Sequence, residues 1–217
     1  MITSRQMKEL EEYAEEQGIH PRELMENAGR QVFLVVKEKY DLTNKRIVIF
    51  AGPGNNGGDG FVAARYFAQE HPVLILFFGD KQKLSAESWE NYEKVRRKAN
   101  IIPIGNREDL GKFHVQEGMQ LVLIDALLGI GVRGSLREPI SAAIDYFNSL
   151  PGLKIAVDIP SGLNPDTGEV PEKRCDVDLI VTFHDLKVGL QNIQEKTVVV
   201  DIGIPPPQNS VNFFSIE

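Results

Sequence analysis

Cysteine and basic charge are both scarce in this sequence. Cys175 is the only cysteine among 217 residues, so an intrachain disulfide is excluded. The absence of a disulfide framework favours a reducing compartment. Lys and Arg number 24 against 31 Asp and Glu, which gives a formal net charge of −7. A broad basic surface for nucleic acid is therefore not expected, and an anionic ligand would have to be held by local donors.

Long apolar runs are missing as well. The longest, VLILFF at 73–78, is far too short to cross a bilayer, which takes about 20 residues. The N-terminal stretch MITSRQMKELEEYAEEQG is acidic and has no apolar core, so it resembles neither a signal peptide nor an arginine-rich transit peptide. We therefore expect a soluble, cytoplasmic protein that binds neither a membrane nor nucleic acid.

The chain does contain apolar segments that alternate with amphipathic ones. Helices are predicted near 3–18, from Pro21 onward, and near 61–70, 84–99 and 138–149. Strands are predicted at 46–50, 73–78, 101–104, 121–124, 154–157, 179–182 and 197–200. Several strands are apolar without alternation, which is typical of strands covered on both faces. Because helices separate the strands, we predict an α/β fold with a mostly parallel sheet in a single domain over 1–217, with N-terminal helices at about 3–39 and a core at about 45–204.

Three polar loops follow three of the predicted strands. They are AGPGNNGGDG (51–60), DALLGIGVRG (125–134) and DIPSG (158–162). Ligands of open parallel sheets bind beyond the carboxyl ends of the strands, where these loops would lie. The first two loops each contain G-x-G-x-x-G, so the string alone is weakly specific, and its glycines serve equally for tight turns and close packing.

The first loop fits a dinucleotide-binding turn only in part. Asp80 lies beyond the next predicted strand, where a ribose-binding acid could sit. Asp59, however, stands at the predicted helix entrance, where its carboxylate would repel a phosphate. The alternative is that Asp59 is simply the helix N-cap.

The three loops together supply oxygen ligands. Asp125 and Asp158 follow strands, Asn55 or Asn56 offers an amide oxygen, and Ser161 offers a hydroxyl. Such hard donors suit an alkali or alkaline-earth cation better than zinc. Each aspartate alone could be a turn or cap residue. Their convergence at one sheet edge favours a nucleotide-like site with acid/base chemistry and a bound cation.

Longer motifs make the pattern specific. GNNGGDGFVAAR (54–65), DALLGIGVRG, VDIPSGLNPDTGE (157–169), VTFHDLKVG (181–189) and VVVDIGIP (198–205) follow LMENAG (24–29) in this order. Together they resemble the NAD(P)H-hydrate epimerase family over nearly the whole chain. The resemblance implies a Rossmann-like three-layer α/β/α sandwich and an isomerase that interconverts the R and S epimers of NAD(P)HX at C6. NAD(P)HX is hydrated, damaged NADH or NADPH, so the reaction would be metabolite repair.

The resemblance also implies roles for individual residues. Potassium would be held by Asn56, Asp125 and Ser161. The residues that would contact substrate are Asn55, Asn56, Gly57, Gly58, Asp59, Gly129, Ile130, Gly131, Val132, Arg133, Gly134, Ser135 and Asp158.

Epimerisation at a carbinolamine carbon requires a positioned acid or base, whether the hydroxyl leaves or the ring opens. Asp158, at a predicted strand end, is the first candidate. Lys187, within HDLKVG, is the second and could steer the diphosphate or polarise a reacting oxygen; the alternative is a solvated surface lysine. His184 is interpreted as a structural loop residue, and Arg133 could meet a phosphate.

Partners and alternatives follow from the same resemblance. We expect a stand-alone epimerase, a homodimer, that passes its product to an NAD(P)HX dehydratase on another chain. One alternative is an NAD(P)-dependent oxidoreductase, which would need the Asp80 ribose contact. The other is a non-catalytic nucleotide-binding or protein-interaction module. The intact GNNGGD loop and Asp158 favour the enzyme.

Overall fold

A seven-stranded sheet organises the structure. The computed structural model describes residues 1–113, 115–116, 118–131 and 134–207. The strands are β1 (Arg46–Ala51), β2 (Val73–Phe77), β3 (Asn100–Pro103), β4 (Leu121–Ala126), β5 (Leu153–Val157), β6 (Leu179–Phe183) and β7 (Thr197–Val200). Their order is β3-β2-β1-β4-β5-β6-β7, and every neighbouring pair is parallel. The strand order reverses between β1 and β4, which is where such sheets bind ligands.

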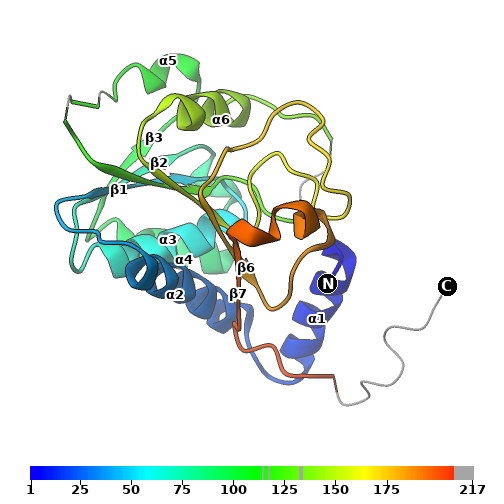
Figure 1. Cartoon of the computed structure of the whole chain (residues 1–217). Helices are drawn as coiled ribbons and strands as arrows, with labels where there is room; N and C mark the ends of the chain where they lie inside the picture. Colours follow the sequence, from blue (N-terminus) through cyan, green and yellow to red (C-terminus); the bar gives the residue numbers. More distant parts are fainter. Residues whose placement is uncertain (114, 117, 132–133, 208–217) are drawn as a thin grey trace.

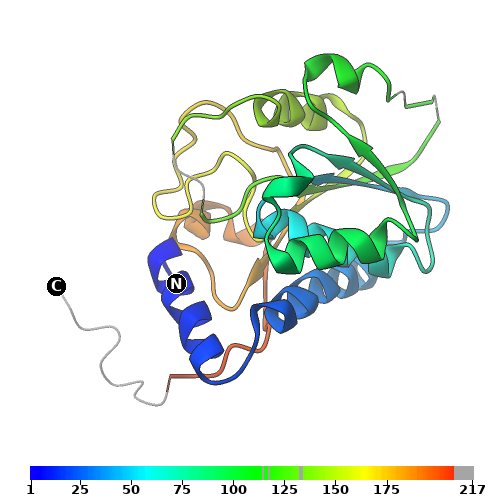
Figure 2. The same cartoon turned by 180° about the vertical axis from the view of Figure 1, so that it is seen from behind.

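Helices cover both faces of the sheet (Figures 1 and 2). On one face pack α2 (Pro21–Lys39), α3 (Asn55–Phe67) and α4 (Ala86–Val95), and on the other α5 (Arg107–Leu110) and α6 (Ile140–Ser149). Strand β1 shows why the strands are apolar throughout: Ile47 and Ile49 face the first layer, whereas Val48 and Phe50 face the second. The predicted three-layer α/β/α fold is confirmed.

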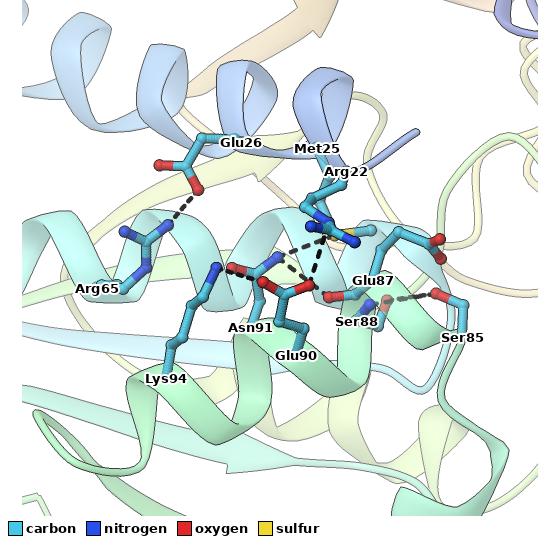
Figure 3. Close-up of polar contacts among 10 residues, drawn as sticks. All are labelled: Arg22, Met25, Glu26, Arg65, Ser85, Glu87, Ser88, Glu90, Asn91 and Lys94. Carbon is cyan, nitrogen blue, oxygen red and sulfur yellow. Dashed lines mark hydrogen bonds and ion pairs between the residues drawn. The ribbon is translucent and has the colours of Figure 1, made fainter. Parts of the chain in front are cut away.

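Polar contacts tie α2, α3 and α4 to one another, as Figure 3 shows. Glu26 of α2 pairs with Arg65 of α3. Arg22 of α2 lies 3.1 Å from Glu90 of α4, which also pairs with Lys94 at 2.7 Å. Exposed pairs of this kind contribute at most about 1 kcal/mol each. The layer is therefore held mainly by its apolar core, and the ion pairs fix how its rim is arranged.

The N-terminal helix α1 (Ser4–Glu16) lies beside the segment that follows β6 (Figure 1). Thr3 is its N-cap: the Thr3 hydroxyl accepts a hydrogen bond from the Gln6 N–H, and the Gln6 side chain accepts one from the Thr3 N–H. This reciprocal pair satisfies two backbone donors that a helix start would otherwise leave free. The helix predicted near 3–18 is thus confirmed, and it begins just after the Thr3 cap.

Two sequence-based boundaries were wrong in ways that matter for the site. Helix α3 begins at Asn55, not near 61, so the polar loop is in fact the first turns of a helix. Asn and Gly are poor helix formers, and tertiary packing overrides their propensity here. Asp125 lies inside β4, paired between Phe50 and Ala156, rather than in the loop after it. The 3₁₀ segments η1 (Lys81–Lys83) and η2 (Val188–Lys196), and α5, were not predicted.

Candidate functional site

The glycine-rich turn packs tightly against the loop after β4. A Cβ on Gly52 would lie 1.8 Å from the carbonyl oxygen of Leu127, and one on Gly57 would lie 1.9 Å from the carbonyl oxygen of Gly52. Backbone atoms cannot yield that space. Gly58 is confined by side chains instead, those of Ser88 and Met25, which Figure 3 shows in the helix layer. Close packing therefore explains these glycines, and Asn55 is left exposed at the first position of α3.

A buried hydrogen-bond network joins the three predicted potassium ligands. Asp125 is fully buried, and its carboxylate accepts from the Ser161 N–H at 2.7 Å and the Ser161 hydroxyl at 2.6 Å. The Leu128 N–H donates to the Ser161 hydroxyl oxygen at 2.9 Å, and the Leu128 carbonyl accepts from Asn56 Nδ2 at 2.9 Å. The structure thus brings Asn56, Asp125 and Ser161 together from α3, β4 and the loop after β5.

These oxygen ligands suit a monovalent cation. Among the described residues no group of three or more His, Cys, Asp and Glu side chains converges, and Asp125 is the single carboxylate of the network. Burial raises the pKa of Asp125, while its hydrogen bonds from Ser161 and Leu127 oppose that rise. With one carboxylate, one amide and one hydroxyl, hard monovalent ions match the chemistry better than zinc.

Asp158 occupies a strained position directly after β5. Its φ is 64°, in the left-handed region that non-glycine residues rarely adopt, and such strain clusters at functional sites. One carboxylate oxygen is fully engaged: Oδ1 accepts from Thr182 Oγ1 at 3.1 Å, from the Phe183 N–H at 3.1 Å and from Lys187 Nζ at 2.6 Å. From the part of the chain that the structure describes, Oδ2 accepts no hydrogen bond, so this oxygen is available to a ligand.

Lys187 is not the solvated surface lysine of the alternative interpretation. Its side chain has 0% exposure, and besides Asp158 its ammonium group donates to the Phe183 carbonyl at 2.6 Å. His184, between them, is half-buried and also has a positive φ of 67°. Burial, followed by the charge of Lys187, lowers the pKa of His184. Lys187 is thereby placed to hold the Asp158 carboxylate, and His184 is a loop residue with constrained backbone.

Asp59 is not the N-cap of α3. The cap is Gly54, and Asp59 lies in the second turn of the helix. Burial raises the pKa of Asp59 well above its usual range, and the negative charges of Asp158 and then Glu11 add to this rise. The charge of Asp158 is thus one of the causes that favour the protonated form of Asp59.

The second glycine loop lies against the first. A Cβ on Gly129 would stand 3.2 Å from the Asn56 Cβ, whereas Gly131 has open space around it. Ile130 and Gly134 line a pocket of about 290 Å³ together with Ile159 and Pro160, the two residues that follow Asp158 in the sequence. Ser135 is exposed. Val132 and Arg133 lie outside the described residues, so the predicted phosphate contact of Arg133 stays a prediction.

Two further residues refine the sequence interpretation. Asp80 is exposed, and its carboxylate accepts from the Gln82 N–H at 2.9 Å as the cap of η1. Glu11 of α1 was missed as a perturbed acid: burial, followed by the charge of Asp158, raises its pKa. The signal was present in the sequence, because an acidic residue stands at an inward position of the amphipathic α1.

Comparison with known proteins gives consistent matches. Residues 21–189 match the family model described as YjeF-related protein N-terminus. The NAD(P)H-hydrate epimerase of Nitrosopumilus maritimus is 35% identical over 214 residues, which covers 94% of this chain and 96% of that protein. The bifunctional NAD(P)H-hydrate repair enzyme Nnr of Pyrobaculum aerophilum is 41% identical over 213 residues, covering 94% of this chain and 42% of the relative.

The fold has a solved counterpart. The crystal structure of yeast ynu0, YNL200c, superposes with a TM-score of 0.79 at 21% identity, covering 93% of this chain and 87% of that one. This chain spans about two fifths of the length of the bifunctional relatives that it matches. Both the matched family model and the full-length likeness to the archaeal epimerase lead to one assignment: the chain belongs to the YjeF-related N-terminal family.

Proposed function

We propose that this protein is an NAD(P)H-hydrate epimerase, an isomerase that interconverts the R and S forms of NADHX and NADPHX at C6. The observation that carries the proposal is Asp158: a buried carboxylate at a strand end, with Oδ1 held by three donors and Oδ2 free of hydrogen bonds from the described residues. Relatives named for this activity support it.

The arrangement suits proton transfer at a carbinolamine carbon. The C6 hydroxyl leaves as water with one added proton, the ring nitrogen forms an iminium bond, and water then returns on the opposite face and releases a proton. A carboxylate whose one oxygen is fixed and whose other oxygen is free can take or give that proton repeatedly. The Lys187 ammonium group keeps Asp158 oriented through its 2.6 Å hydrogen bond to Oδ1.

We also propose that potassium binds at Asn56, Asp125 and Ser161. A cation there would offset the repulsion between the substrate diphosphate and the nearby carboxylates. Potassium should raise the thermal midpoint of the wild-type protein, and Ser161→Ala should weaken that dependence. Ser149→Ala is the control, since the Ser149 hydroxyl is exposed and donates only to the Tyr146 carbonyl. An unchanged potassium titration for Ser161→Ala would exclude this ligand set.

The assembly and setting are proposals too. We expect a homodimer and a coupled NAD(P)HX dehydratase, since bifunctional repair enzymes are among the relatives. Sedimentation would test the dimer. Among the helices that the structure describes, none combines the length and the apolar composition needed to cross a bilayer. A cytoplasmic location stays a prediction.

The deciding experiment uses separated epimers. The protein is incubated with purified R or S epimer of NADHX and of NADPHX, with potassium present, and each mixture is followed by chromatography. Interconversion from both sides toward one ratio is expected. No interconversion would reject the proposal. Tight binding of NAD⁺ with hydride transfer would favour the oxidoreductase, and binding of NADHX without turnover would favour the non-catalytic module.

A further inference from the structure

The pocket beside Asp158 lies between two loops and the start of α1. Its volume of about 290 Å³ far exceeds the roughly 10–15 Å³ that one water molecule needs. The loop after β4 lines it with Gly129, Ile130 and Leu136, the loop after β5 lines a second side, and Ser4 of α1 completes it. The pocket is therefore large enough to hold part of a small organic molecule.

Apolar walls and carboxylates are combined in this pocket. Ile159 belongs to a buried apolar cluster against which Ile130 packs. Asp166 and Glu172 also line the pocket, and among its described lining residues there is no lysine, arginine or histidine. The Asp166 carboxylate is held by the N–H and hydroxyl of Ser4, each at 2.6 Å. A diphosphate would be repelled here, so the pocket suits a flat, uncharged group with N–H donors.

Two connections place the pocket next to Asp158. The first is covalent: Ile159, a lining residue, follows Asp158 directly, and consecutive Cα atoms are only about 3.8 Å apart. The second runs through the N-terminus, because Ile2 forms a parallel bridge with Lys187, whose ammonium group donates to Asp158 Oδ1 at 2.6 Å. Ser4, two residues further along the chain, lines the pocket. A molecule bound at Asp158 can therefore extend into it.

Asn164 and Glu172 offer the pocket one donor group and one acceptor group. Asn164 Oδ1 accepts from the Asp166 and Thr167 N–H groups at 2.9 and 3.1 Å, so its Nδ2 group is what remains for a ligand. Glu172 Oε1 accepts from the Leu136 N–H at 3.0 Å, which uses one of the roughly four acceptor sites of a carboxylate. A primary carboxamide, with a carbonyl oxygen and an NH₂ group, matches this pair.

We propose that this pocket recognises the carboxamide end of the reduced nicotinamide ring. Asn164 Nδ2 donates to the amide oxygen, and the Glu172 carboxylate accepts from the amide nitrogen. The inference rests on the proposed function and extends it to the choice of substrate. The carboxamide is attached to C3, which lies across the ring from C6. A ring with C6 at Asp158 therefore directs its amide away from that carboxylate and toward the pocket.

The proposal gives Glu172 a role in specificity. The nicotinate analogue of NADHX carries a carboxylate where NADHX has the carboxamide. It has no N–H to donate to Glu172, and its negative charge faces that of the glutamate. A site built to bind a substrate N–H rejects an analogue that lacks it, because its own polar group is then left unpaired. We expect the protein to act on amides and to exclude the corresponding acids.

The first test compares NADHX with its nicotinate analogue as substrates. For the wild type, kcat/KM for NADHX should exceed that for the analogue by at least about 10-fold. Glu172→Gln keeps an acceptor for the Leu136 N–H but removes the charge and adds a donor, so it should reduce this preference about 10-fold. Glu169→Gln is the control, because Glu169 is exposed in the same loop and does not line the pocket. Equal use of both substrates by the wild type, or a preference that Glu172→Gln leaves unchanged, would overturn the proposal.

Asn164→Asp tests the donor. Aspartate keeps the Oδ1 acceptor for the Asp166 and Thr167 N–H groups, so the turn is retained, but an oxygen replaces the Nδ2 donor. The KM for NADHX should rise about 10-fold with little change in kcat, the pattern expected when a binding contact is lost. Asn192→Asp, at an exposed position, should behave as wild type. An unchanged KM in Asn164→Asp would contradict the assigned contact.

Calorimetric titration separates this inference from the proposed function. NADHX and its nicotinate analogue are titrated into wild type, Glu172→Gln and Glu169→Gln. If epimers do not interconvert, yet NADHX binds more tightly than the analogue and Glu172→Gln narrows the difference, only the reaction is wrong. If epimers interconvert but the two ligands bind equally well, the carboxamide pocket is wrong. Absence of both turnover and binding would reject both.

Discussion

The Lys187 ammonium group donates to Asp158 Oδ1 at 2.6 Å, with side-chain exposures of 0% and 9%. The two residues come from different strand ends, and the pair is nearly removed from water. Desolvation makes such a pair a weak source of net stability, but removal of either partner leaves an uncompensated buried charge. The pair therefore fixes the orientation of the Asp158 carboxylate.

Lys187→Met is expected to destabilise the protein strongly, because the Asp158 carboxylate then loses its buried counter-charge. The expected loss in the free energy of unfolding is about 3–5 kcal/mol, measured by urea titration. Lys98→Met, at an exposed position of the chain, should change it by less than about 0.5 kcal/mol. Equal stability of the two variants would contradict the pairing.

Asp158→Asn should slow the reaction in the protein that remains folded, and it should also lower stability because the buried Lys187 ammonium group loses its counter-charge. Asparagine adopts positive φ more readily than most residues, so the backbone at 64° remains accessible. Its amide cannot carry the proton, and turnover of purified R epimer should fall by at least about 100-fold. Asp176→Asn, an exposed change, is the control. Near-normal turnover with an intact fold would remove Asp158 from catalysis.

Stability should depend on pH through Asp59. Its pKa is raised in the folded protein, so between the unfolded and folded pKa values the folded state binds more protons. The free energy of unfolding then falls as pH rises through that window. Asp59→Asn removes this loss, so its stability relative to wild type should improve as the pH rises from 4 to 8.

The measurement is urea unfolding of both proteins across that pH range. Asp176→Asn should track wild type, because that side chain is exposed. A constant difference between Asp59→Asn and wild type from pH 4 to pH 8 would mean that Asp59 titrates normally.

Alanine substitutions at two glycines of the turn, Gly57 and Gly54, should differ in their effect on stability. Gly57→Ala places a Cβ 1.9 Å from the Gly52 carbonyl oxygen, and overpacking against backbone should cost about 2–3 kcal/mol. Gly54 has no heavy atom within 4 Å of its hypothetical Cβ. Gly54→Ala should therefore lose at most about 1 kcal/mol, for a poorer cap. Thermal and urea unfolding would check both, and similar values would argue against backbone contact as the reason for Gly57.

Much of the fold could be predicted because local patterns agree with the tertiary arrangement. Runs such as RIVIF and LVLI are apolar on both faces since both faces are covered, and this is visible in sequence. The start of α3 could not be predicted: Asn and Gly favour loops, and only contact with the loop after β4 makes a helix there.

Residues that directly follow strands could be placed from the sequence. Residues whose burial depends on tertiary contacts could not. Asp158 and Ser161 sit in one short motif at a strand end, so their position at this edge of the sheet could be predicted. The burial of Lys187 depends on contacts with Asp158 and Phe183 that no local pattern encodes. The contact of Ile2 with Leu186 and Val188, which docks the start of α1 beside this loop, likewise joins segments far apart in the sequence.

The pairing of Ile2 with Lys187 has a consequence for how the protein is made. Strands β1 to β4 carry mutually consistent pairings that are available once residue 126 has been synthesised. Helix α1 must wait for residues 186–188 before it can dock. The hydrogen bonds of Ile2 with Leu186 and Val188 can therefore form only after the loop that follows β6 has been synthesised.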